Sequence, residues 1–298
     1  MQFFVQQFFN GLQLGSLYAL IALGYSMVYG VLLLINFAHG DIFMFGAFVG
    51  VLASMVLGLP FIPTLLMSMI ITALLGVTIE RVAYKPLREA SRLSVVITAL
   101  GVGLLLENGM LALTGADPRK YPDDLITVDV YKPLGISISN VKIIIIVLAF
   151  VLFLGLYMIV QRTKWGMAMR AISYDKFAVP LMGVSQDQII SLTFILGTGL
   201  AAAGGILWGV AYTGLSPYMG MRVGWKCFTA AVVGGIGDIR GAMLGGLLLG
   251  FIEIFVPAYG NDIGISSTWR DPIAFGLLLL ILVVRPTGLF GVARRQKV

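Results

Sequence analysis

The chain has 298 residues, of which 59% are hydrophobic and 11% charged, and its mean hydropathy is +0.97. Soluble domains carry about a quarter charged residues, so a single water-soluble globular core is excluded. The net charge of +6 comes from short positive clusters between apolar runs. Such clusters are typical of membrane topology signals and not of a basic face, so no nucleic-acid partner is expected.

Long apolar segments follow one another along the chain and predict an all-α, polytopic bundle of transmembrane helices in a single domain over 1–298. A spanning helix needs about 20 mostly apolar residues. The unbroken run 143–160 excludes the weak alternation of a membrane β-barrel. The predicted segments are 5–33, 42–57, 61–82, 93–113, 141–161, 186–213, 222–236, 241–258 and 272–285.

The segment 42–57 decides the expected number of crossings. If it spans the membrane, the total is nine helices and the N-terminus is external. If 36–57 is re-entrant or broken, the total is eight and the N-terminus is internal; eight is slightly favoured. No lysine or arginine precedes Arg81, so the positive-inside rule does not place the N-terminus.

Charge distribution predicts the sidedness of the later loops. Positive residues cluster within 81–92, 162–176 and 285–297, which are therefore expected in the cytoplasm. The loops 114–140 and 259–271 mix acidic and basic residues, and 114–140 is predicted to be periplasmic. The amphipathic segment 162–188 is either a helix lying on the membrane surface or a docking site for a cytoplasmic partner.

Five polar residues interrupt apolar surroundings: Asn36, His39, Asp41, Glu107 and Glu253. Polar groups at membrane depth are costly and imply a cavity, a partner or an interface, so all five are candidates for a substrate pathway. Asn36 and His39 would donate hydrogen bonds to an amino or carboxyl group of the substrate. In the alternative, Asp41 is an interfacial helix cap, stabilised at a helix N-terminus.

Glycines at helical spacing predict close helix packing, with Gly237, Gly241 and Gly245 on one face. Packing within the chain is favoured over a face toward a second subunit or the pathway. The segments 36–50 and 234–250 share the tripeptide Gly-Asp-Ile, which leaves open a diverged internal repeat or a coincidence.

Catalytic and metal chemistry is not expected of this chain. His39 is the lone histidine and makes no metal site, and the lone cysteine, Cys227, is interpreted as a packing residue. The chain has no Gly-Lys dipeptide and hence no phosphate-binding loop. We expect no enzymatic activity, no bound cofactor and no ATP hydrolysis by the chain itself.

The strongest motif is the Asn-x-Ala-His-Gly sequence at 36–40, which lies within the region 11–48. The glycine-rich segment 229–246 is a second, and it departs from the usual small polar residue by having Asp238. A third motif runs through Arg170, Ala171, Asp175, Ala178 and Gly183. With these motifs, the chain resembles, over essentially its whole length, the LivH-type permeases of branched-chain amino-acid ABC importers.

The resemblance implies an alternating-access subunit in a bacterial plasma (inner) membrane. Its expected partners are membrane lipid, a homologous second permease forming a heterodimer, two cytoplasmic ABC ATPases that use ATP and Mg, and a periplasmic substrate-binding protein. The third motif would contact the ATPases. Leucine, isoleucine and valine are the expected substrates. The alternatives are a permease for urea, short amides or other amino acids, an ATPase-independent channel or secondary carrier, and a membrane scaffold.

Overall fold

The computed structural model describes residues 1–132, 135, 137–212, 214–260, 264 and 266–291. Helices account for nearly all regular structure in this part of the chain, and the short β1 (Val130–Tyr131) and β2 (Ile138–Ser139) pair antiparallel. The helices are α1 (Gln2–Leu32), α2 (His39–Met55), α3 (Phe61–Ile79), η1 (Glu80–Tyr84), η2 (Lys85–Leu87), α4 (Arg92–Thr114), α5 (Asn140–Arg162), α6 (Lys164–Tyr174), α7 (Ala178–Leu181), α8 (Gln186–Ala211), α9 (Met219–Gly234), α10 (Ile239–Gly260), η5 (Ser267–Trp269) and α11 (Arg270–Val284).

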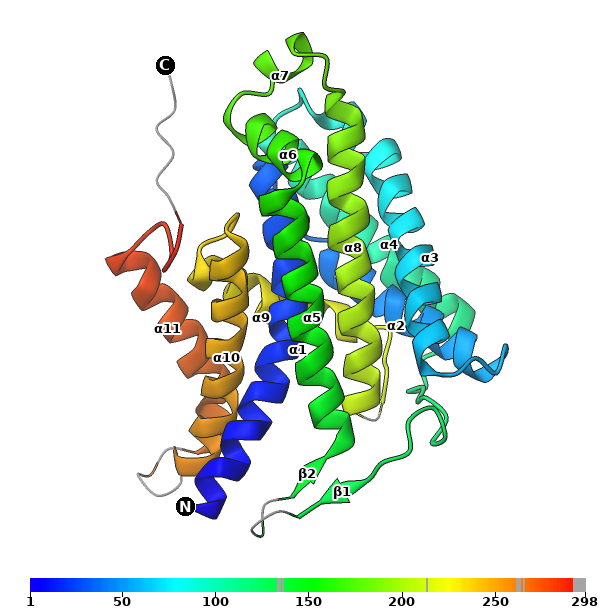
Figure 1. The fold of residues 1–298 in the computed structure, drawn as a ribbon, viewed down its shortest axis with the longest axis vertical. Coiled ribbons are helices and arrows are strands. Elements are labelled where there is room, and N and C mark those ends of the chain that lie inside the picture. Colours follow the sequence, from blue (N-terminus) through cyan, green and yellow to red (C-terminus); the bar gives the residue numbers. More distant parts are fainter. Residues whose placement is uncertain (133–134, 136, 213, 261–263, 265, 292–298) are drawn as a thin grey trace.

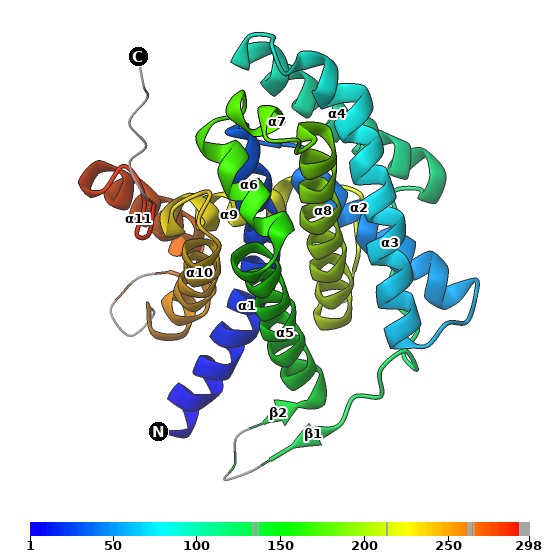
Figure 2. The same ribbon diagram turned by 45° about the horizontal axis from the view of Figure 1, so that its top comes forward.

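Seven helices of the described chain are long and apolar enough to cross a membrane. Figures 1 and 2 show α1 and α8 inside the bundle, with α11 at one edge and α3 and α4 at the other. The central helices α1 and α8 are mostly buried, whereas α4, α5 and α11 expose most of their apolar side chains. Helices that are apolar all round suit a lipid environment, so the predicted all-α polytopic bundle is confirmed.

Different elements lie at the two ends of the bundle. Figure 1 shows α6 and α7 at one end, and the N-terminus, β1 and β2 at the other. The predicted cytoplasmic segments 162–176 and 285–291 thus lie opposite the loop 114–140. The N-terminus lies at the same end as the loop 114–140, so the two share one side of the membrane.

Two short helices, α2 with 17 residues and α9 with 16, lie in the middle of the bundle (Figure 1). Each follows a non-helical stretch, and before each helix a side-chain oxygen accepts a hydrogen bond from the backbone N–H two residues later. Asn36 Oδ1 accepts a hydrogen bond from the Ala38 N–H at 3.1 Å, and Ser216 Oγ accepts one from the Tyr218 N–H at 3.3 Å. Within segment 36–57 the helix α2 runs without interruption from His39 to Met55. Neither short helix meets the length of a full span, so the number of crossings stays a prediction.

Glycines bring the starts of α2 and α9 together. A Cβ atom at Gly40 would lie 2.4 Å from the Gly220 carbonyl oxygen and 2.9 Å from the Gly224 Cα, so only glycine permits this approach. The helix that meets the start of α2 is therefore α9. The second Gly-Asp-Ile tripeptide, 237–239, lies at the start of α10 and not in α9. The sequence match with 40–42 is therefore not related to the contact between α2 and α9.

The other glycines mostly pack helices within the chain. Gly241 and Gly245 of α10 face the backbone of α9, which confirms internal packing for both. The expectation that Gly237 shares their helical face is wrong. Gly237 lies in the turn before α10 with φ +98°, and it contacts Gly30 of α1. The turn arises because the Asp238 carboxylate accepts the Gly241 N–H at 2.8 Å and so starts the helix after Gly237.

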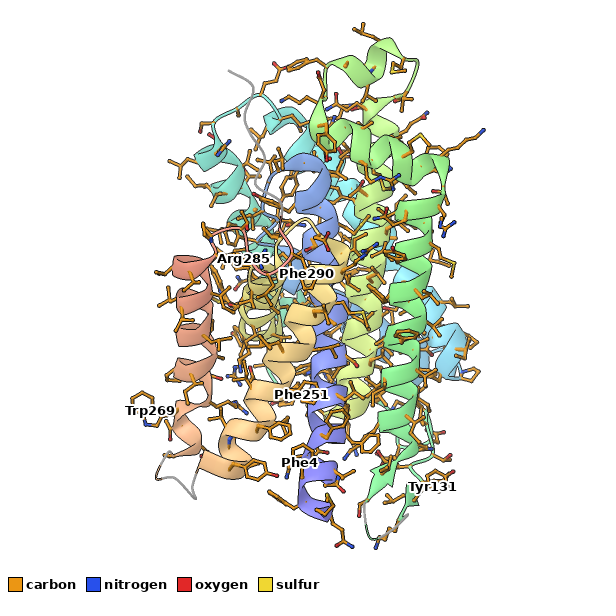
Figure 3. The ribbon with its side chains drawn as sticks, turned by 60° about the vertical axis from the view of Figure 1, so that its left-hand side comes forward. Phe4, Tyr131, Phe251, Trp269, Arg285 and Phe290 are labelled. Atoms are coloured by element: carbon orange, nitrogen blue, oxygen red, sulfur yellow. The ribbon has the colours of Figure 1, made fainter. Side chains whose placement is uncertain are left out.

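An aromatic seam joins the outer halves of α1 and α10. Its ring pairs are Phe3 with Tyr259 at 5.5 Å, Phe4 with Phe255 at 5.6 Å and Phe8 with Phe251 at 5.2 Å between centroids. Figure 3 shows Phe4 and Phe251 in this seam, with Trp269 and Tyr131 toward the same end. Such aromatic residues are typical of a membrane–water interface.

Candidate functional site

Asn36 is buried at the turn that leads into α2. Its Oδ1 atom accepts a hydrogen bond of 2.7 Å from the hydroxyl of Tyr84, in η1, in addition to the bond from the Ala38 N–H. The Nδ2 group has no hydrogen-bond partner within the described residues. Asn36 thus links the start of α2 to η1, which continues α3, and keeps one donor without a partner among the described residues.

His39, the first residue of α2, is fully buried against α1. Gly24 provides the space, because a Cβ atom there would lie 2.3 Å from the His39 Nε2 atom. The imidazole lies 4.6 Å from the ring of Tyr25, centroid to centroid. Neither ring nitrogen has a well-formed hydrogen bond in the part of the chain that the structure describes.

Asp41 occupies the first turn of α2 but does not cap it with its side chain. Its Oδ1 lies against Gly220 of α9 and its Oδ2 against Gly103 of α4, at 2.5 Å from where a Cβ of either glycine would stand. Glu107, one turn beyond Gly103, is close enough for its charge to act on Asp41. The start of α9 therefore faces a buried carboxylate whose Oδ1 atom has no hydrogen-bond partner among the described residues.

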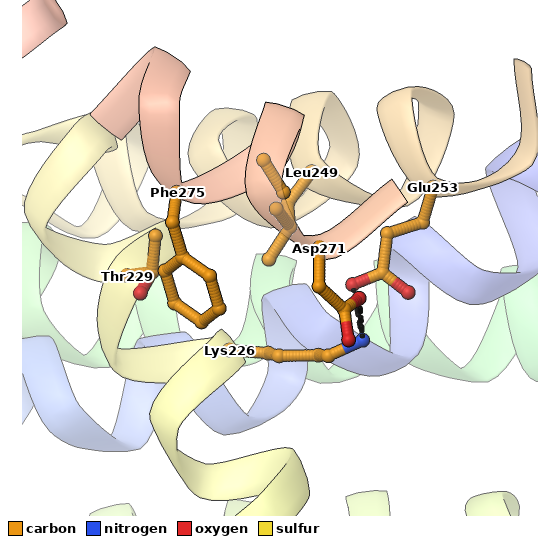
Figure 4. Close-up of a pocket in the computed structure, with 7 residues that line it drawn as sticks. Lys226, Thr229, Leu249, Glu253, Asp271 and Phe275 are labelled. Atoms are coloured by element: carbon orange, nitrogen blue, oxygen red, sulfur yellow. Dashed lines mark hydrogen bonds and ion pairs between the residues drawn. The ribbon is translucent and has the colours of Figure 1, made fainter. Parts of the chain in front are cut away.

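The structure thus brings together four of the five polar candidates, around the start of α2. The fifth, Glu253, belongs to a separate cluster between α9, α10 and α11. Figure 4 shows the Lys226 side chain reaching the carboxylates of Glu253 and Asp271. Lys226 Nζ lies 2.8 Å from both Glu253 Oε1 and Asp271 Oδ1, and Tyr18 donates a hydrogen bond of 3.0 Å to Glu253 Oε2.

This cluster, which we call the Lys226 cluster, consists of Lys226, Glu253, Asp271 and Tyr18. Glu253 is buried and Lys226 nearly so, whereas Asp271 is half-exposed. The next residue of α9, Cys227, is fully buried and free, as expected of a packing residue. A buried carboxylate is tolerated at low dielectric when it is ion-paired and hydrogen-bonded, as Glu253 is. The ion pair with Lys226 joins α10 to α9, and the pair of Lys226 with Asp271 joins α9 to α11.

The segment 162–188 forms two short helices at the end opposite β1 and β2 (Figure 1). The guanidinium of Arg170 donates to the carbonyl of Val160 and so folds α6 back onto α5. Asp175 Oδ1 accepts the N–H groups of Phe177 and Ala178 at 2.9 and 3.0 Å, and thereby starts α7. These contacts shape the segment from within.

The exposed face of this segment is apolar. Phe177, Leu181 and Met182 are each more than three-quarters exposed, and Ala171 and Ala178 are exposed beside them. Gly183 follows with φ +79°, and a Cβ atom there would meet nothing within 4 Å, so this glycine serves the turn and not a tight contact. Sequence reasoning did not single out these three large side chains. The signal was available, because they are apolar residues within a charged segment.

A charge network that the sequence reasoning also missed joins η1, η2 and the start of α8. Arg88 pairs with the buried Glu80, whose other oxygen accepts a 2.9 Å hydrogen bond from Ser191. Asp187 lies 2.5 Å from Arg88 Nη1 and 2.6 Å from Lys85 Nζ. Glu80 was inconspicuous because it lies inside the apolar segment 61–82.

At the end of the bundle that carries β1 and β2, the loop 114–140 is anchored on the helices. The Tyr121 hydroxyl donates a hydrogen bond of 2.7 Å to the carbonyl of Ala47, and its ring fills the space left by Gly50 and Gly209. Burial raises the pKa of Tyr121. Arg119 and Leu215 exchange backbone hydrogen bonds of 2.9 and 2.7 Å, which tie this loop to the stretch before α9.

No group of three or more histidine, cysteine, aspartate or glutamate side chains among the described residues could hold a metal ion. Together, seven helices that are long and apolar enough to span a membrane and two shorter helices that meet inside the bundle define a multi-pass membrane protein. The model of one family, described as "Branched-chain amino acid transport system / permease component", matches residues 7–283. The chain belongs to this family.

Named relatives support the assignment over nearly the full length. The chain is 41% identical to the high-affinity branched-chain amino acid transport system permease protein BraD of Pseudomonas aeruginosa, covering 99% of this chain and 98% of that one. It is 39% identical, with the same coverages, to LivH of Salmonella typhimurium. A metal-chelate type ABC transporter in an inward-facing conformation has a similar fold, with a TM-score of 0.51, 16% identity, and 93% of this chain and 85% of that chain covered.

Proposed function

We propose that this chain is the permease subunit of an ATP-binding-cassette importer that moves leucine, isoleucine and valine across the inner membrane. The full-length similarity to BraD and LivH carries this proposal, because both are named for branched-chain amino acid transport. The partners are a homologous second permease in a heterodimer, two ABC ATPases and a periplasmic binding protein. ATP and Mg are used by the ATPases, and this chain is not catalytic.

The substrate pathway passes the starts of α2 and α9. Asn36 and His39 offer polar atoms without partners, and Asp41 and Glu107 add two carboxylates that suit the ammonium group of an amino acid. In transporters, the ends of half-helices near the membrane midplane place such groups at the binding site. Glu253 borders the same pathway from the far side of α9, held by Lys226.

The ATPases dock on 162–188, with Arg170, Ala171, Asp175, Ala178 and Gly183 shaping the contact. Leu181→Ser with Met182→Ser is expected to lower ATP-driven uptake at least tenfold, because the docking face loses its largest apolar contacts. The check is uptake per ATP hydrolysed by the assembled complex in proteoliposomes. Val130→Ser, at an exposed position of the opposite end, is the matched control. Equal coupling ratios in the double variant and the control would refute the docking role.

The direct test of the proposed function is uptake of labelled leucine into proteoliposomes, with urea as the comparison. Uptake is expected only when the second permease, both ATPases, ATP and the binding protein are all present. Leucine uptake by this chain alone would instead identify a channel or a secondary carrier. Uptake of urea and not leucine by the complete set would support the importer assignment but show that the substrate is urea.

A further inference from the structure

A groove with a volume of 820 Å³ opens near the cytoplasmic end of the bundle. It lies over α8, and Figures 1 and 2 show α8 between α5 and α3. The described side chains that line it come from η1 and η2, the end of α5, the start of α6 and the first half of α8. They are Glu80, Arg81, Lys85, Ile159, Thr163, Trp165, Asp187, Gln188, Ser191, Leu192, Ile195 and Leu196.

The lining changes from polar to apolar along α8. Gln188 and Ser191 come first, and Leu192, Ile195 and Leu196 follow toward the middle of the helix. From 188 to 196 the helix advances about 12 Å, at 1.5 Å per residue. Ile159 of α5 completes the apolar part. The groove therefore offers a polar mouth at the interface and an aliphatic floor at membrane depth.

The mouth carries net positive charge. The carboxylates of Glu80 and Asp187 are already neutralised by Arg88 and Lys85. Arg81 lines the groove, is exposed and makes no ion pair with any described residue. The chain adds positive charge beside it, since the exposed Arg162 and Lys164 flank Thr163 of the lining.

Trp165 completes the mouth with an indole ring that is half-exposed. Tryptophan prefers the headgroup level of a bilayer, where its ring meets hydrocarbon and its N–H meets water. A phosphate bound between Arg81 and Lys85 would supply the anion that the guanidinium of Arg81 lacks in the described chain. A protein helix would meet both needs only if it placed an acidic side chain beside Arg81.

We propose that this groove binds an anionic phospholipid of the cytoplasmic leaflet. Its phosphate lies at Arg81 and Lys85, its glycerol region contacts Thr163 and Trp165, and one acyl chain follows Leu192, Ile195 and Leu196. Basic pockets between transmembrane helices on the cytoplasmic side are suited to anionic headgroups. The lipid would fill the space between α5 and α3 beside the docking segment 162–188, and its binding requires neither substrate nor ATP.

Fluorescence quenching by lipids tests this site. The full chain is reconstituted in vesicles that contain phosphatidylglycerol or phosphatidylcholine with brominated acyl chains, and Trp165→Phe identifies the contribution of Trp165 among the four tryptophans. We expect the Trp165 component to be quenched preferentially by phosphatidylglycerol. Arg81→Gln should weaken this preference about fivefold, the effect of one basic residue at an anionic surface.

Arg92→Gln is the matched control, because Arg92 is also an exposed arginine of the cytoplasmic end but does not line the groove. It should leave the preference unchanged. Equal quenching by both lipids, or equal losses in Arg81→Gln and Arg92→Gln, would overturn the proposal. Shielding of Trp165 from both lipids in the assembled transporter would overturn it as well, because another subunit would then occupy the groove.

Discussion

Replacing Gly40 by valine is expected to destabilise the bundle strongly and to lower the midpoint of its thermal inactivation. A Cβ atom there would lie 2.4 Å from the backbone oxygen of Gly220, and backbone cannot move aside as a flexible side chain can. Overpacking a well-packed contact costs about 1–3 kcal/mol, and this position falls at the upper end because two helix backbones must separate. The measurement is the fraction of detergent-solubilised protein that stays monodisperse after heating through a series of temperatures.

Gly155→Val provides the control for Gly40→Val. Gly155 also lies within a helix, but a Cβ atom there meets nothing within 4 Å. The two substitutions change helix propensity equally and differ in the space available. Equal midpoints of thermal inactivation for the two variants would show that α2 and α9 do not meet at Gly40.

The contact between α2 and α9 is a feature that could not be predicted from the sequence. The spans follow from local composition, since a run of about 20 apolar residues has few alternatives in lipid. The meeting of Gly40 with Gly220 and Gly224 depends on a contact between distant parts of the chain. Neither helix shows this partner in its own pattern, and the tripeptide shared by 36–50 and 234–250 does not indicate that α2 contacts α9.

Among the polar candidates, too, the residues could be predicted from the sequence but their contacts could not. Asn36, His39, Asp41 and Glu107 stood out because they are polar within apolar surroundings, and the fold brings them together. Glu253 stood out for the same reason, yet its partner Lys226 lies 27 positions earlier on a different helix. Sequence spacing does not reveal such a pair, because it depends on how α9, α10 and α11 pack.

Lys226→Met is the second substitution for which a large effect is expected. It would leave Glu253 without the ammonium group at 2.8 Å, while the hydrogen bond from Tyr18 and the more distant Arg270, at 3.8 Å, remain. Removing one partner of a buried ion pair costs about 3–5 kcal/mol. The remaining contacts place the expected loss near the lower value, about 3 kcal/mol, measured as the free energy of unfolding in mixed micelles.

Lys120→Met is the control for the exposed case, because Lys120 and Asp123 pair at 3.5 Å in water and such pairs contribute about 0–1 kcal/mol. The double variant Lys226→Met with Glu253→Gln separates charge from shape, since the buried carboxylate is then neutral. It should recover more than half of the stability that Lys226→Met loses. A double variant no more stable than Lys226→Met would mean that Lys226 acts through packing of its aliphatic chain, and that Glu253 does not depend on the Lys226 cluster for its charge.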